Sequence, residues 1–194
     1  EALFQGEGNI ALYNNVFVNR HGSAIHIQPH NGVPGEIDIF GNTVLASGHG
    51  ISVTGGNPAM RQRVRDNVVF ANPPLQGSAE ASGNLVGSFD NAVLHLRRAV
   101  GPLEAIDLRP MRPVRGRPAR DTALPDADRD FCGTPRSGTA PGAFVDEGPT
   151  PKLSITIPGS VRSSAAPSER TRPFTETTSI LCGPSGTSNR FFAY

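Results

Sequence analysis

The sequence predicts an all-β protein whose chain winds into a parallel β-helix, a solenoid of short strands. Two observations carry this prediction: one sequence unit recurs along the first half of the chain, and the apolar residues inside it alternate with a period of two. A unit this short cannot enclose its own core, whereas stacked units bury a continuous apolar column. With 194 residues the chain is long enough to bury such a core.

The recurring unit is marked by an asparagine between apolar residues. LYNNVF, IFGNTV and VRDNVV contain Asn15, Asn42 and Asn67, whose separations are 27 (42 − 15) and 25 (67 − 42) residues, and the shortened copy ASGNLV adds Asn84 after 17 (84 − 67). We expect each asparagine at a bend that needs a left-handed backbone, which asparagine tolerates better than other non-glycine residues. The stacked amides should then form a hydrogen-bonded ladder from coil to coil.

The strands between the asparagines predict a ligand groove on the outside of the solenoid. AIHIQ and GISVT lie 26 residues apart (50 − 24), and alternation turns Ile25 and Ile27 toward the core. The side chains between them then point outward, and the loops PHNGVPG and GGNPAMRQ, which follow these strands, should wall that face. We therefore predict a substrate-binding groove lined by His26, Gln28, His30, Ser52, Thr54, Arg61 and Arg63.

The repeats over roughly residues 2–89 resemble the right-handed parallel β-helix proteins of the pectate-lyase-like group, which implies a right-handed coil. A second resemblance is to the closing segment of many secreted bacterial β-helix proteins, D-x-x-G-x-x-R followed by G-A-x-x-x-E. It falls on Asp130, Gly133, Arg136, Gly142, Ala143 and Glu147. The resemblance implies a secreted bacterial protein that engages an extracellular polysaccharide, as the C-terminal part of a lyase or glycoside hydrolase acting on a uronate-type polymer. The alternative is a non-catalytic, adhesin-like surface scaffold.

The stretch GHGIS resembles the histidine motif of polygalacturonases and makes His49 the one candidate catalytic residue. In that family an Asp-Asp pair precedes the strand one coil earlier, where this chain has Gly22 and Ser23. Inverting hydrolysis needs two carboxyl groups, so their replacement argues against polygalacturonase activity. A glycine bend before an alternating strand accounts for the motif without any chemical role for His49.

Charge and composition restrict the other partners. The net charge is +1 and no apolar run reaches the length of a membrane span, so neither a nucleic acid nor a membrane is an expected partner. The arginines between residues 97 and 120 either bind a polyanion or solvate one flank of an extended segment. No histidine pair has metal-ligand spacing, so no metal or cofactor is predicted; Ca²⁺ held by Glu36, Asp38 and Asp66 stays the open alternative. We expect a monomer.

Three regions follow from these patterns. Residues 1–96 form the β-helix coils, 97–148 an arginine- and proline-rich exit segment with a C-terminal cap folded back on the last coil, and 149–194 a low-complexity linker or flexible tail in which LSITI adds at most one strand. The two cysteines, Cys132 and Cys182, allow a single bridge between the cap and the tail.

Overall fold

The structure, a computed structural model, describes residues 2–5, 7–112, 124–136 and 140–145, together with the backbone of 179–181 and 188–193. The strands of the coils are β1 (Ala2–Gln5), β2 (Gly8–Tyr13), β3 (Val16–Asn19), β4 (Ile25–Gln28), β5 (Pro34–Phe40), β6 (Thr43–Ala46), β7 (Ile51–Val53), β8 (Gln62–Arg65), β9 (Val68–Phe70), β10 (Leu75–Gly77), β11 (Glu80–Ser82) and β12 (Leu85–Gly87). The elements that follow are η1 (Phe89–Asn91), α1 (Ala92–His95), β13 (Leu96–Arg98), η2 (Leu103–Ala105), β14 (Asp107–Pro110), β15 (Ser179–Leu181) and β16 (Ser188–Ala193).

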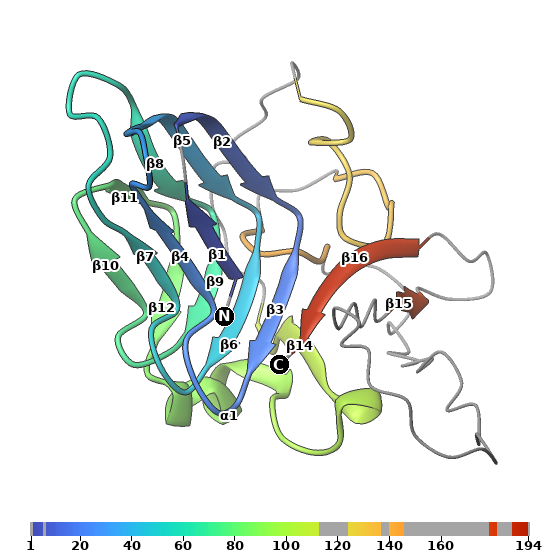
Figure 1. Ribbon diagram of the computed structural model, residues 1–194. Coiled ribbons are helices and arrows are strands. Elements are labelled where there is room, and N and C mark those ends of the chain that lie inside the picture. Colours follow the sequence, from blue (N-terminus) through green and yellow to red (C-terminus); the bar gives the residue numbers. More distant parts are fainter. Residues whose placement is uncertain are drawn as a thin grey trace, which may run out of the picture.

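These coils form the predicted parallel β-solenoid, in which successive strands enter three sheets in turn (Figure 1). We call the sheets, in the order of their strands, sheet 1 (β1-β4-β7-β10), sheet 2 (β11-β8-β5-β2) and sheet 3 (β12-β9-β6-β3-β16-β15). All neighbours among β1 to β12 pair in parallel, and Ile25 lies beside Ile51 in the register that the repeat spacing predicts. The repeat therefore decides both the fold and the register.

An apolar column fills the interior of the solenoid. Alternation turns every second residue of sheets 1 and 2 inward, so Ile25, Ile27, Ile37 and Ile39 are fully buried. They pack in one cluster with Phe17 of sheet 3. Burying an isoleucine or phenylalanine side chain contributes about 1.5–3 kcal/mol, so this column is the main source of stability in the coils.

Sheet 3 differs from the other two because it is buried on both faces. Its strands read VFV, TVLA and VVF, and every residue of β3, β6 and β9 is buried. The outward residues form a second cluster with residues that follow the coils, including Leu96, Ile106, Phe131 and Ala143. Strands covered on both faces read as continuous apolar runs rather than alternating ones, and these three do.

The apolar outer face of sheet 3 explains where the cap lies, and it corrects our expectation that the cap folds onto the last coil. Residues 124–136 and 140–145 instead contact the earlier coils: the Tyr13 hydroxyl donates to the carbonyl of Pro125, and the N–H of Ala143 donates to Thr43 Oγ1. The last coil is contacted by η1, where the Phe89 N–H donates to Asn72 Oδ1. Covering an apolar sheet face gains more than covering a strand edge, because it removes more apolar area from water.

The exit segment is also less extended than its composition predicts. The single helical turn α1 directly precedes it, and the segment itself enters the antiparallel pair of β13 and β14. Arg109 does not solvate a flank, since it is buried and its guanidinium lies 2.6 Å from the Asp107 carboxylate. Arg97, Arg98 and Arg112 are exposed, and the arginines at 115, 117 and 120 lie outside the described residues.

Little of the predicted tail is described. LSITI lies outside the described residues, and the boundaries at 96 and 148 stay predictions. Two short strands occur further on: β15 pairs antiparallel with β16, and β16 pairs in parallel with β3 at the N-terminal end of the coils (Figure 1). Cys132 is disulfide-bonded, while Cys182, the other cysteine of the chain, lies outside the described residues.

Candidate functional site

The predicted asparagine ladder is present and stabilises the corner between sheets 2 and 3. Each Nδ2 donates to the Oδ1 of the next coil, at 3.1 Å from Asn15 to Asn42, 2.9 Å from Asn42 to Asn67 and 3.0 Å from Asn67 to Asn84. Each of these Oδ1 atoms also accepts the backbone N–H of the preceding asparagine. Asn42 and Asn67 are fully buried, so the bonds satisfy polar groups that water cannot reach.

The left-handed backbone lies one residue earlier than predicted. Asn14, Gly41, Asp66 and Gly83 have φ between +54° and +64°, and each directly precedes a ladder asparagine. The expectation that the ladder asparagines themselves adopt this conformation is wrong. The turn is made by the preceding residue, and this leaves the amide free to point into the stack.

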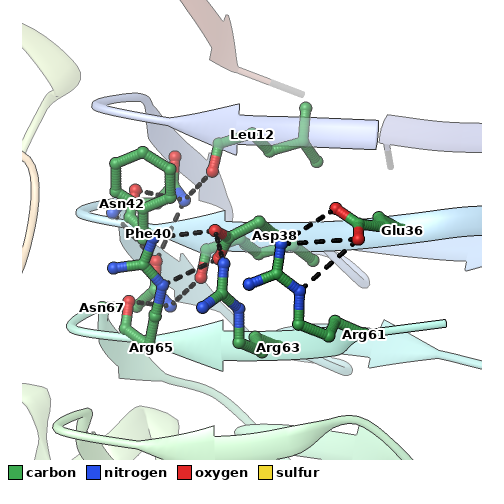
Figure 2. Close-up of polar contacts among 10 residues, drawn as sticks. Leu12, Glu36, Asp38, Phe40, Asn42, Arg61, Arg63, Arg65 and Asn67 are labelled. Carbon is green, nitrogen blue, oxygen red and sulfur yellow. Dashed lines mark hydrogen bonds and ion pairs between the residues drawn. The ribbon is translucent and has the colours of Figure 1, made fainter. Parts of the chain in front are cut away.

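The outer face of sheet 2 carries a charged cluster centred on Asp38, which Figure 2 shows beside the ladder. Because Ile37 and Ile39 point inward, Asp38 points outward, as predicted, and accepts bonds from two arginines of the next coil. Arg63 lies 2.6 Å and Arg65 2.7 Å from Asp38 Oδ2. Only 13% of the Asp38 side chain is exposed, so both pairs are largely shielded from water and fix the three side chains.

Next to Asp38 the face is more open. Arg61 pairs with Glu36 at 3.3 Å, and both side chains are exposed, at 65% and 44%. Asn9 accepts the N–H of Glu36 at 2.9 Å and extends the row to the first coil. The row surrounds a hollow of about 300 Å³ lined by Asn9, Ile10, Ala11, Glu36, Ile37, Asp38, Arg61, Arg63 and Leu124.

Aromatic side chains lie on the same face at the C-terminal ends of β2 and β5, next to the asparagine ladder. Tyr13 and Phe40 stack with centroids 5.1 Å apart, and the Arg65 guanidinium lies 4.5 Å from the Phe40 ring centroid. Phe40 is only 3% exposed, so this stack is no open platform for a sugar ring. Burial, and secondly the charge of Asp126, raises the pKa of the Tyr13 phenol.

The predicted groove residues divide between two sheets. His26 lies beside Ser52 on the outer face of sheet 1, and its Nε2 is 3.3 Å from Thr54 Oγ1. Gln28 shares that strand, in which half-buried residues alternate with buried ones, so it points outward with His26. Arg61 and Arg63 instead line the hollow on sheet 2, because the bend after β7 carries the chain to the next side of the solenoid.

The three histidines do not gather in one place. His30 is exposed in the turn after β4, His26 lies within β4, and His49 lies in the bend before β7. His49 stacks on Ser23, whose hydroxyl lies 3.2 Å from its Nδ1. Their common groove is therefore a hypothesis that the geometry does not favour, and the roles of these residues stay predictions.

Ser23 occupies the place next to His49 where the polygalacturonase motif requires a carboxylate. The stacking of the two coils is direct, because the N–H of Ala24 donates to the carbonyl of His49. The Ser23 hydroxyl also accepts the N–H of His49 at 3.2 Å, and within the described residues no group orients Nε2 of the imidazole. A nucleophile and base act together when a third group orients the base, so this pair reads as a structural contact between coils.

The acids considered for Ca²⁺ have other neighbours. Glu36 and Asp38 are paired with arginines, and Asp66 lies at the left-handed bend before Asn67. No group of three or more His, Cys, Asp or Glu side chains in the described residues is placed to hold a metal ion. Within the same residues, no helix has the length and apolar character to cross a membrane.

The repeat spacing contained a signal for the Asp38 cluster that the sequence analysis missed. In a solenoid of this period, residues 25 to 27 positions apart lie side by side, and 38 to 63 and 38 to 65 are separations of 25 and 27. Glu36 and Arg61 are likewise 25 apart.

Comparison with known proteins finds no match among protein-family profiles, curated proteins or solved structures. The fold is therefore established by the structure alone, as a parallel β-solenoid.

Proposed function

We propose that the outer face of sheet 2 binds an extracellular polysaccharide. The hollow lined by Asn9, Glu36, Asp38, Arg61 and Arg63 is the observation that carries this proposal. Sugar hydroxyl groups both donate and accept hydrogen bonds. Guanidinium groups supply several donors and carboxylates supply acceptors, so the two kinds side by side suit such a ligand. Concave sites with a few converging polar groups are the usual form of binding sites.

The ion pairs on this face differ in strength: the pairs of Asp38 hold its side chain in place, whereas the exposed pair of Arg61 and Glu36 can rearrange around a ligand. Arg61 and Glu36 are exposed, and an exposed ion pair contributes less than about 1 kcal/mol, so a ligand can replace their mutual contact at little cost. Asp38 is held by Arg63 and Arg65 and keeps its position before the ligand arrives. Preorganised groups of this kind lose little conformational entropy on binding.

A uronate-type polymer is the class of ligand that this arrangement supports best among polysaccharides. Arg61 is the most exposed cation of the cluster, and a guanidinium binds a carboxylate through paired hydrogen bonds. A secreted location fits the disulfide-bonded Cys132, because disulfides persist in oxidising compartments.

A second candidate function is a non-catalytic surface scaffold. The observation that favours it is the uninterrupted ladder from Asn15 to Asn84, joined on the neighbouring face by the Asp38 pairs, since both connect coil to coil. In this reading the charged cluster only stiffens the solenoid.

Binding to a glycan array that includes pectin and alginate fragments distinguishes the two. The proposal predicts that Arg61→Ala weakens binding at least about tenfold, the loss expected for a hydrogen bond to a charged group. Arg98→Ala, at another exposed arginine, which lies on β13, is the matched control and should change nothing. Absence of binding to any glycan, or binding that Arg61→Ala leaves unchanged, contradicts the proposal and favours the scaffold. Ultraviolet absorbance of unsaturated uronates in the same mixtures reports lyase activity directly.

A further inference from the structure

The N-terminal end of the solenoid exposes part of its interior. In sheets 1 and 2 the first-coil residues Phe4 and Leu12 point inward but are only half buried, whereas their neighbours in the next coil, Ile27 and Ile39, are fully buried. A cavity of about 430 Å³ opens here, lined in part by Phe4, Leu12 and Phe17. Among the described residues, no strand pairs with the outer edges of β1 and β2.

The ladder has a direction, and its two ends are complementary. Every Oδ1 from Asn42 onward accepts two hydrogens from the coil before it, but Asn15 Oδ1 receives none from the described residues. At the other end the backbone N–H of Asn84 has no acceptor among the described residues, although Asn15, Asn42 and Asn67 each donate theirs to the following Oδ1. Within the described residues, the N-terminal end of the ladder therefore lacks donors for Asn15 Oδ1, and the C-terminal end lacks an acceptor for the N–H of Asn84.

The C-terminal end of the coils has matching strands. β10, β11 and β12 are the last members of sheets 1, 2 and 3, and their outer edges are unpaired within the described residues. All three run in the same direction as β1, β2 and β3, because every pairing within the coils is parallel. The C-terminal end of one chain thus has the strand order and direction that the N-terminal end of another would pair with.

The β16 strand covers one of the three open edges. Its backbone pairs in parallel with β3, with Phe191 beside Val16, Phe192 beside Phe17 and Ala193 beside Val18. In Figure 1 this strand, near the C-terminus, lies beside β3 at the end of the stack. It takes the place that β12 of a second chain would need.

From these contacts we propose that the N-terminal end of the solenoid is a docking surface for the C-terminal coil of a second copy of this chain. In this proposal β16 blocks the docking surface, because it already pairs with the edge of β3. Open edges of parallel strands are templates for further strand pairing, and proteins commonly cover them. The two surfaces differ, so the contact is heterologous, and its repetition yields an open chain of copies rather than a closed dimer. This inference is independent of the proposed glycan site.

Disrupting the pairing of β16 with β3 tests the proposal in the full chain. Phe192→Pro deletes a backbone N–H in the middle of the β16–β3 pairing, and Phe192→Leu is the control that keeps it. We expect the mass of the proline variant, measured by light scattering after size-exclusion chromatography, to rise with protein concentration. The wild type and the leucine control should keep the mass of a single chain. Ala193→Pro is a proline control that should also keep the single-chain mass, because alternation turns the N–H of Ala193 away from β3.

A substitution in β2 shows which surface is used. The N–H of Asn14 points toward β5, so alternation turns the N–H of Ala11 toward the open edge, where proline spares the β2–β5 bonds. Adding Ala11→Pro to Phe192→Pro should restore the single-chain mass, and so should an excess of a synthetic peptide spanning residues 188–194. Two results overturn the proposal: Phe192→Pro stays a single chain at all concentrations, or the wild type and the Ala193→Pro control associate as strongly as Phe192→Pro does.

Discussion

Replacing Asn42 by leucine is the sharpest perturbation of the ladder, because it removes an amide from the middle of the stack while keeping the number and branching of the side-chain heavy atoms. Asn42 is fully buried. Its Nδ2 donates to the carbonyls of Leu12 and Phe40 and to Asn67 Oδ1, at 2.9, 3.1 and 2.9 Å (Figure 2). Its Oδ1 accepts the backbone N–H and the Nδ2 of Asn15. The substitution therefore removes all five contacts at once.

The expected loss of stability depends on which former partners of Asn42 keep another hydrogen bond after the substitution. The carbonyl of Phe40 keeps the N–H of Asn14, and Nδ2 of Asn15 keeps the carbonyl of Tyr13, so both remain satisfied. The backbone N–H of Asn15 keeps no acceptor among the described residues, and leaving a buried donor unsatisfied costs about 1–3 kcal/mol. Together with the four other lost bonds, at about 0.5–1.5 kcal/mol each, we expect Asn42→Leu to cost at least about 3 kcal/mol of unfolding free energy.

Urea denaturation followed by far-UV circular dichroism measures this cost, since the chain contains no tryptophan for fluorescence. Asn9→Ala is the matched control. Asn9 also accepts an N–H from the next coil, that of Glu36, but it is exposed, so its loss should cost less than about 1 kcal/mol. An Asn42→Leu variant that loses no more stability than Asn9→Ala would refute the reasoning.

Two further substitutions test the segments that cover sheet 3. Burial acts to raise the pKa of Asp107, but the hydrogen bonds and charge of Arg109 lower it below its ordinary value of 3.8. Asp107 therefore stabilises the fold above that pH and loses this effect as the pH falls through its lowered pKa. Asp107→Asn should cost up to about 3 kcal/mol at neutral pH, and the difference from wild type should shrink below pH 3.8 in urea titrations; a constant difference contradicts the assignment. Gly142 has φ +92°, and an added Cβ would lie 2.7 Å from a Val68 methyl carbon, so Gly142→Ala should cost about 1–3 kcal/mol. Gly101 also has positive φ but open space around it, and thermal melting should show a smaller loss for Gly101→Ala.

The sequence predicted the solenoid well because a repeat encodes register directly. Residues 25 to 27 positions apart become neighbours, and this predicts both the stacked strands and the column from Asn15 to Asn67, which the shortened copy with Asn84 extends. Alternation within strands then distinguished core from surface, as for Asp38 between Ile37 and Ile39. Both inferences depend only on period, which is a local property of the chain.

The sequence pattern does not predict correctly the features that depend on contacts between distant segments, such as the position of the cap. The period does not indicate on which side of the solenoid a residue lies. The predicted groove therefore combines Arg61 with His26, although Arg61 lies at the hollow on sheet 2 and His26 on sheet 1. The need to cover strand edges predicts a cap on the last coil, whereas the cap packs on the apolar outer face of sheet 3, which buries more apolar area. The continuous apolar run of β6, Thr43–Ala46, was the available signal for that second buried face.

Hydrogen exchange of the side-chain amides, followed by NMR, tests the central claim most directly. If the asparagines stack as one buried ladder, the Nδ2 protons of Asn42 and Asn67 exchange only on unfolding of the coils, far more slowly than those of exposed Asn31. Exchange of Asn42 and Asn67 at the rate of Asn31 would contradict the ladder and the coil stacking that depends on it.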